Sequence, residues 1–136
     1  MNEKEYKMVN LFERGKFTSN AGITLHYKIE CDSLTEEDIA TLAEIIGERT
    51  GFSKVISVPR GGDKLATALE KYEDIAYDTI LIVDDVLTTG GSMERVKKQV
   101  MHDYSDEYDE IIGIVLFARE KCPDWITAVF QMWDND

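Results

Sequence analysis

Two adjacent carboxylates and a loop of small residues form the group in this sequence that is best suited to chemistry. Asp84 and Asp85 follow the apolar run Ile-Leu-Ile-Val, and the loop after them consists of Thr88, Thr89, Gly90, Gly91 and Ser92. Glycines let the backbone turn its amides toward one point, and the hydroxyl groups add donors, so this 88–92 loop suits a phosphate monoester. The acids would repel that phosphate. They must instead face a divalent metal or vicinal hydroxyl groups. A phosphorylated sugar offers both a phosphate for the loop and hydroxyl groups for the acids. The bland alternative is a buried strand that ends in an exposed acidic turn.

A second loop with anion-binding character lies upstream. It is the 59–64 loop, which reads Pro-Arg-Gly-Gly-Asp-Lys and follows the short apolar run 54–58. Gly61 and Gly62 allow a ligand to approach the backbone closely, and Arg60 and Lys64 supply positive charge. Such charge is needed, because the chain as a whole carries a net charge of −12.

The elements that position these loops are predicted from periodicity. Continuous apolar runs at 54–58, 80–83, 111–118 and 126–133 are typical of buried parallel strands. Helical spacing at 33–50, 65–72 and 94–101 alternates with them, and Thr35 with Asp38 resembles a capping box. The fold class predicted is therefore α/β, with a mostly parallel twisted sheet flanked by helices and ligands at the carboxyl ends of its strands. Toward the N-terminus we expect a helix over 3–14, a turn at 20–22 and a strand over 23–31.

Length and composition restrict the function classes. With 136 residues, the whole chain, 1–136, is predicted to be one domain, of which 1–32 forms the N-terminal helix and strand. A net charge of −12 disfavours nucleic acid as a partner. Cys31 and Cys122 lack metal-ligand spacing, and neither a signal peptide nor a membrane-spanning segment is expected. A cytoplasmic protein with no membrane partner is expected.

The segment from Val83 to Ser92 resembles the phosphoribosyl pyrophosphate signature of type I phosphoribosyltransferases. The resemblance implies Mg²⁺ as cofactor, and it implies that Asp84 and Asp85 are catalytic: they contact the ribose hydroxyls and reach the metal directly or through those hydroxyls and water. It also implies that the 88–92 loop holds the 5-phosphate. The 59–64 loop is similar to the family's pyrophosphate loop, with Arg60, Gly61, Gly62 and Lys64 as the binding residues.

The N-terminal part is similar, more loosely, to orotate phosphoribosyltransferases, in which a phenylalanine, a small-residue turn and a strand form a hood over the base. The segment concerned runs from Phe17 to Asp32, and His26 and Lys28 lie on the polar side of its strand. The resemblance implies two partners, phosphoribosyl pyrophosphate and a small nitrogenous base that is orotate-like. Members of the family often dimerise, so a homodimer is open to this chain.

The sequence departs from the family between the helix at 65–72 and the acidic strand. Active members place a further strand and a long mobile lid there, whereas this chain has only residues 73–78. Two functions follow: a phosphoribosyltransferase, or a non-catalytic phosphoribosyl pyrophosphate-binding or regulatory protein of the same fold. A response-regulator receiver, which also places paired acids after a strand, is disfavoured because too little chain follows Asp85. Trp125 follows the 111–118 run, near where a base would lie, and an indole can stack on a heterocycle. Burial as a core aromatic is the favoured interpretation.

Overall fold

The computed structural model describes residues 10–18, 22 and 24–133, and the chain divides into two compact units. The first unit is Met1–Asp38 and the second is Ile39–Asp136. The chemistry-bearing residues of both loops belong to the second unit. The assignment of the whole chain to one domain stays a prediction.

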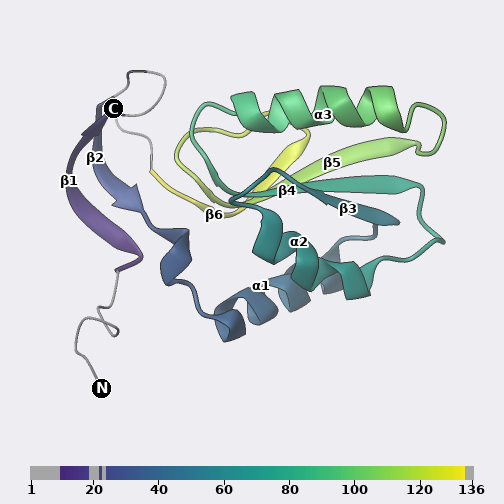
Figure 1. Cartoon of the computed structure of the whole chain (residues 1–136), viewed down its shortest axis with the longest axis horizontal. Coiled ribbons are helices and arrows are strands. Elements are labelled where there is room, and N and C mark those ends of the chain that lie inside the picture. Colours follow the sequence, from purple (N-terminus) through teal and green to yellow (C-terminus); the bar gives the residue numbers. More distant parts are fainter. Residues whose placement is uncertain (1–9, 19–21, 23, 134–136) are drawn as a thin grey trace. The chain divides into compact units, whose positions relative to one another are not determined.

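The second unit is built on a four-stranded parallel sheet in the order β3-β4-β5-β6 (Figure 1). Its strands are β3 (Lys54–Ser57), β4 (Thr79–Leu87), β5 (Glu110–Ala118) and β6 (Ile126–Gln131). In the registers, Val83 pairs with Ser57 on one side and with Ile114 on the other, which places β4 at the centre. The carboxyl ends of β3 and β4 therefore lie side by side.

Helices cover both faces of this sheet. Helix α3 (Gly91–Asp103) lies on one face, and α1 (Glu36–Arg49) and α2 (Asp63–Leu69) lie on the other (Figure 1). A short 3-10 turn, η3 (Glu70–Tyr72), continues α2. Residues 80–84 in the first part of β4 are all buried, because a strand covered on both faces has no solvent side. The predicted α/β class with a mostly parallel sheet is confirmed.

Helix α1 begins as its sequence predicts. The Thr35 N–H donates to Asp38 Oδ2 (2.9 Å), and the Asp38 N–H donates to Thr35 Oγ1 (3.0 Å). This reciprocal pair satisfies two amides that a helix start otherwise leaves without partners.

The first unit contains an antiparallel pair, β1 (Phe12–Thr18) and β2 (Thr24–Ile29). The predicted strand over 23–31 is confirmed over Thr24–Ile29 by β2, whereas its last residue, Cys31, begins a 3-10 turn, η2 (Cys31–Ser33). The predicted helix over 3–14 is wrong at Phe12–Arg14, which belong to β1, and its earlier part falls on residues 1–9, outside those described. Phe12 pairs with Ile29 across the strands, and its ring meets that of Tyr27 edge-on at 6.3 Å, so cross-strand contacts outweigh the helical spacing. Of the predicted turn, only Gly22 is described, at φ +80°.

The connection from η3 to β4 is short and runs beside the edge strand β3. The Glu73 carboxylate accepts a hydrogen bond from the Val55 N–H (2.9 Å), and the Asp74 N–H donates to the Phe52 carbonyl (2.9 Å). The connection then enters β4 at its amino end. Residues 73–78 therefore do not pass over the carboxyl ends of the strands, where the two loops lie.

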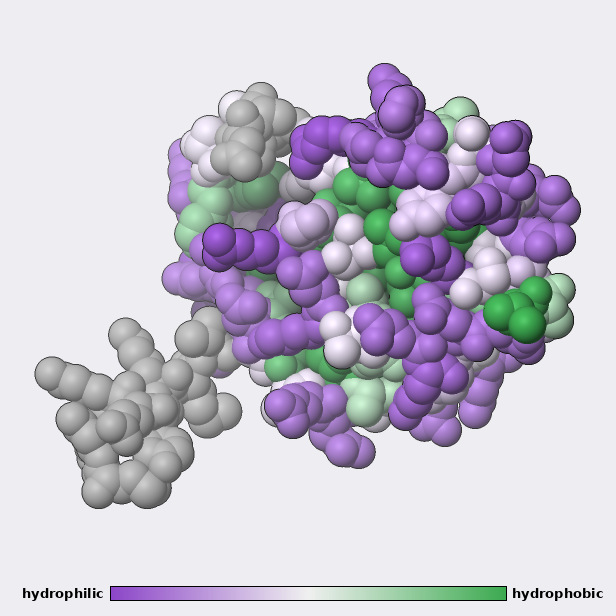
Figure 2. Space-filling view, turned by 45° about the vertical axis from the view of Figure 1, so that its right-hand side comes forward, coloured by the Kyte–Doolittle hydropathy of each residue, from purple (hydrophilic) through white to green (hydrophobic). Residues whose placement is uncertain are grey.

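The surface reflects the composition. On the face shown in Figure 2, hydrophilic side chains predominate, with hydrophobic side chains exposed between them. Among the described residues, no helix has the length and apolar character that crossing a membrane requires.

Candidate functional site

The two predicted loops meet at the carboxyl ends of neighbouring strands. The 59–64 loop comes shortly after β3, and the 88–92 loop comes directly after β4. A hydrogen bond from the Val58 N–H to the Val83 carbonyl (2.8 Å) joins the two chain segments just before the acid pair. The structure thus brings together the residues that the sequence places in separate motifs.

The 88–92 loop forms a small polar hollow. Gly90 adopts φ +81° and ψ −1° directly before α3, a conformation that favours glycine. The first intrahelical bond runs from the Glu94 N–H to the Gly90 carbonyl (3.0 Å), so the amides of Gly91, Ser92 and Met93 make up the helix start, where partners within the helix are lacking. The hollow has a volume of about 40 Å³, and its lining includes Asp84 and all five residues of the loop. Its donors and its size suit one phosphate group.

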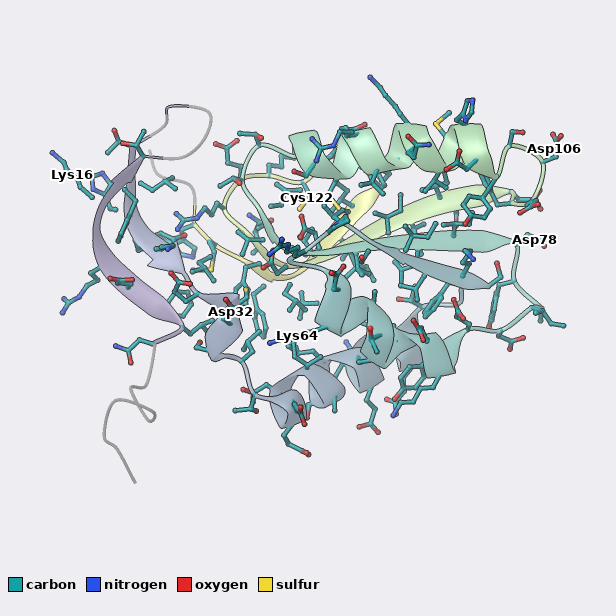
Figure 3. The ribbon with its side chains drawn as sticks, in the orientation of Figure 1. Lys16, Asp32, Lys64, Asp78, Asp106 and Cys122 are labelled. Carbon is teal, nitrogen blue, oxygen red and sulfur yellow. The ribbon has the colours of Figure 1, made fainter. Side chains whose placement is uncertain are left out.

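The 59–64 loop is shaped by its two glycines. A Cβ on Gly62 would collide with the Val83 carbonyl oxygen and lie 3.1 Å from the Val58 nitrogen. A Cβ on Gly61 would lie 2.6 Å from Cγ of Asp85. Both glycines are therefore required by close approach, and the Pro59–Arg60 peptide within this loop is cis. Arg60 is exposed, as is Lys64 near the start of α2 (Figure 3).

Asp84 is a buried acid with an altered titration. Its exposed fraction is 8%. Burial is the main cause that raises its pKa from 3.8 to about 8; the hydrogen bond and charge of Asp85 raise it further, and a bond from the Asp85 backbone opposes the rise. That opposing bond is donated by the Asp85 N–H to Asp84 Oδ1 (2.8 Å). Near neutral pH the ligand-free acid pair therefore holds a proton.

The two acids are divided between the two loops. Asp84 lines the hollow of the 88–92 loop, whereas the carboxylate of Asp85 lies against Gly61 of the 59–64 loop. Asp85 Oδ1 also accepts a hydrogen bond from the Val86 N–H (2.7 Å). Any ligand that occupies both loops must therefore pass the acid pair between them.

The acid pair fits a magnesium ion that the ligand helps to hold. The described residues contain no group of three or more His, Cys, Asp or Glu that could bind a metal ion. Mg²⁺ is usually bound by one or two carboxylates together with phosphate oxygens and water, not by a cage of protein ligands. Asp84 and Asp85 are the residues that would hold it.

Trp125 does not lie at this site, so the weaker alternative of a base contact is wrong and the favoured interpretation as a packed aromatic holds. Its carbonyl accepts a bond from the Gly113 N–H (2.8 Å), and it precedes β6, whose first residue pairs with Gly113. Because β5 and β6 are parallel, Trp125 is placed toward their amino ends. Its Nε1–H donates to Glu94 of α3 (2.7 Å), and Lys97 Nζ lies 4.5 Å from the ring centroid. The indole is a packing residue.

Arg119, for which no role was predicted, lies next to the 88–92 loop. It follows β5 directly, at the edge of the sheet that carries both loops, and only 4% of it is exposed. Its backbone N–H donates to the carbonyl of Leu87 (2.9 Å), the residue immediately before the 88–92 loop. The sequence signal for this position was an arginine at the end of a continuous apolar run, because ligands of parallel sheets bind at the carboxyl ends of the strands.

The comparison with protein families decides the affiliation. A sequence model of the phosphoribosyl transferase domain matches residues 40–132, which span the sheet, both loops and the acid pair. The chain belongs to the type I phosphoribosyltransferase family. No curated protein matches the sequence. Membership in this family disfavours the receiver alternative.

Solved structures show the same phosphoribosyltransferase fold. Orotate phosphoribosyltransferase from Aeropyrum pernix superposes with a TM-score of 0.71 at 21% identity, over 89% of this chain and 88% of that one. The Francisella tularensis orotate enzyme gives a TM-score of 0.60 at 16% identity, over 89% and 80%. Xanthine-guanine-hypoxanthine phosphoribosyltransferase from Helicobacter pylori gives 0.51 at 16%, over 69% and 89%. The type I phosphoribosyltransferase fold is thereby confirmed.

Proposed function

We propose that this chain binds phosphoribosyl pyrophosphate with Mg²⁺ and transfers the 5-phosphoribosyl group to a small nitrogenous base, orotate-like in class. The observation that carries the proposal is the division of the acids between two anion-binding loops: Asp84 lines one and Asp85 touches the other. Phosphoribosyl pyrophosphate matches this arrangement, because it carries a phosphate at one end of the sugar, a pyrophosphate at the other and the ribose hydroxyls between them. Phosphoribosyl transfer in general is supported by the family to which the chain belongs.

Each part has a role in the displacement. The bond between ribose C1 and the pyrophosphate oxygen breaks, and the pyrophosphate leaves with the electron pair. A ring nitrogen of the base then forms the new bond to C1, and the base loses its proton. The ribose carries positive charge in the transition state, so the carboxylates of Asp84 and Asp85 stabilise it while they fix the ribose hydroxyls. Magnesium, when bound, supplies charge neutralisation for the pyrophosphate.

Positive charge at the site offsets the acidic surface. With a net charge of −12, the chain repels anions at long range. Arg60, Lys64 and the start of α3 counter this repulsion locally. Arg60 and Lys64 are therefore proposed to bind the pyrophosphate together with the amides of Gly61 and Gly62, while the residues of the 88–92 loop bind the 5-phosphate.

A second candidate is a phosphoribosyl pyrophosphate-binding protein without transferase activity. The observation that favours it is the connection between η3 and β4. Residues 73–78 pass the amino half of β3 and enter β4 at its amino end, so this connection supplies no lid over the loops. Lids exclude water from reactive intermediates, and without one transfer is expected to be slow.

Calorimetry and an activity screen separate the two candidates. The unaltered protein is titrated with phosphoribosyl pyrophosphate and Mg²⁺, and pyrophosphate release is followed in the presence of individual bases, orotate among them. Base-dependent release supports the transferase. Tight binding with no release for any base supports the binding protein, and the absence of binding overturns both.

Asp85→Asn tests the assignment of the acids. We expect release to fall by about a hundredfold or more while the melting temperature stays close to that of the parent, because the lost charge acts mainly in the transition state. Asp124→Asn, which removes an exposed carboxylate remote from the loops, is the matched control. Parent-like turnover by Asp85→Asn would show that the role is misassigned.

A further inference from the structure

Ser57 and Asp63 flank the loop that is proposed to bind pyrophosphate. Ser57 is the last residue of β3, and Asp63 is the first residue of α2. The Ser57 hydroxyl donates a hydrogen bond of 2.5 Å to Asp63 Oδ1. This bond joins the two ends of the segment 58–62 and closes it into a ring.

Backbone hydrogen bonds support the ring from within, and the Ala66 N–H to Gly62 carbonyl bond (2.9 Å) ties its last residue to α2. The Gly62 N–H donates to the Val58 carbonyl (2.9 Å), and the Asp63 N–H donates to the Arg60 carbonyl (3.0 Å). Both bonds lie inside the turn, and the Val58 N–H to Val83 carbonyl bond ties only its first residue to β4. The Ser57–Asp63 bond is a side-chain connection from the last residue of the strand to the residue that follows Gly62.

The direction of the Asp63 side chain also matters for charge. Asp63 directly follows Gly62, whose amide belongs to the anion-binding loop. A carboxylate that swung toward the ligand would repel pyrophosphate at a site that has only Arg60 and Lys64 within the loop to oppose it. The hydrogen bond from Ser57 holds the carboxylate toward the end of β3.

We propose that Ser57 and Asp63 are positioning residues for pyrophosphate: the hydroxyl of Ser57 fixes the carboxylate of Asp63, and the closed ring keeps the 58–62 amides and Arg60 in the conformation that receives the anion. This inference rests on the proposed function. It predicts that loss of the Ser57–Asp63 bond weakens the binding of pyrophosphate but not that of the 5-phosphate, because the 88–92 loop is anchored separately by α3 and β4.

The test uses three probes on the full chain with Mg²⁺: phosphoribosyl pyrophosphate, inorganic pyrophosphate and ribose 5-phosphate. For Ser57→Ala, calorimetry is expected to show about tenfold weaker binding of the first two, the usual effect of one lost hydrogen bond to a charged group. Binding of ribose 5-phosphate, which needs only the 88–92 loop, is expected to be unchanged. A general loss of stability would weaken all three probes alike.

Ser53→Ala is the matched control. Ser53 precedes the same strand at its other end, and its hydroxyl donates to the Thr79 carbonyl (3.1 Å). The substitution removes a comparable hydrogen bond far from the loop, so all three affinities are expected to match those of the parent, with melting temperatures recorded for each variant.

A double-mutant cycle isolates the pair. Asp63→Ala and Ser57→Ala are compared with the variant that carries both. If the bond positions the loop, the combined loss in pyrophosphate affinity is clearly smaller than the product of the two single losses. Parent-like pyrophosphate binding by Ser57→Ala, or independent effects in the cycle, overturns this inference and leaves the proposed function standing. Failure of the unaltered protein to bind phosphoribosyl pyrophosphate overturns both.

Discussion

Gly61 of the 59–64 loop and Asp85 of strand β4 lie in direct contact, and the space that a side chain would need at Gly61 is filled by the Asp85 carboxylate. Gly61→Ala must therefore displace either the carboxylate or the 59–64 loop. We expect binding of phosphoribosyl pyrophosphate to weaken by about tenfold to a hundredfold, because one loop or one acid leaves its position.

Calorimetry with a melting curve measures this effect. Thr67→Ala, on the exposed side of α2, is the control for substitution near the loop. Unchanged binding by Gly61→Ala would show that the Asp85 carboxylate can move aside without loss of affinity and that its contact with Gly61 has no role in binding.

Gly90 tests the left-handed turn before α3. Its φ of +81° is unfavourable for alanine and better tolerated by asparagine. Gly90→Ala is expected to lose about 1–2 kcal/mol of stability and to weaken ribose 5-phosphate binding, whereas Gly90→Asn keeps more of both. Denaturant unfolding and calorimetry provide the two readouts, and equal behaviour of the two variants would contradict a conformational role.

Asp84 predicts how stability depends on pH. Its pKa is about 8 in the folded chain against 3.8 as an ordinary side chain, so between these values the folded state holds a proton that the unfolded state has released. Stability of the ligand-free protein should therefore fall as pH rises through this window, by about 1.4 kcal/mol per pH unit at most. Asp84→Asn removes that contribution and is expected to be more stable than the parent at pH 8 but similar at pH 4.

Denaturant unfolding in the absence of metal, at several pH values, measures the slope. Asp124→Asn controls for the change in net charge, since its carboxylate is exposed. If Asp84→Asn and the parent lose stability in parallel as pH rises, burial of Asp84 is not the source of the dependence.

Trp125 predicts an effect on stability without an effect on binding. Trp125→Phe removes the indole N–H that donates to Glu94 and puts a smaller ring beneath Lys97. We expect a loss of about 0.5–1.5 kcal/mol in unfolding free energy, the usual contribution of one hydrogen bond, because the acceptor is only partly buried. Trp133→Phe, at a residue that is 93% exposed, should change stability little. Impaired ligand binding by Trp125→Phe would show that the indole does contribute to the ligand site.

The sequence was sufficient for the features that are local. The acidic strand, both glycine loops and the capping box depend on neighbours within a few residues, and each forms where its pattern predicts. Parallel strands then bring the two loops to one edge, because connections in such sheets leave the carboxyl ends together. The fold class and the meeting of the two loops at the carboxyl ends of neighbouring strands were therefore predictable.

What the sequence could not give depends on tertiary contacts. The helical spacing of residues 3–14 could not reveal that Phe12 would pair with Ile29. The position of Trp125 depends on the register of β6 against β5, and a tryptophan that follows a strand in the sequence can lie at the other end of the next one. The contact of Gly61 with Asp85 and the bond of Ser57 to Asp63 join separate segments, and a raised pKa at Asp84 requires knowledge of its burial.

The hydrogen bond between Glu73 and the Val55 amide has a consequence for how the protein behaves at high concentration. β3 is an edge strand, and an open edge is a template on which strands of other molecules add. A carboxylate bonded to the Val55 amide places negative charge on that edge, and the strand itself spans only four residues. The sheet is thereby closed to growth on this side, which protects the protein against edge-to-edge aggregation.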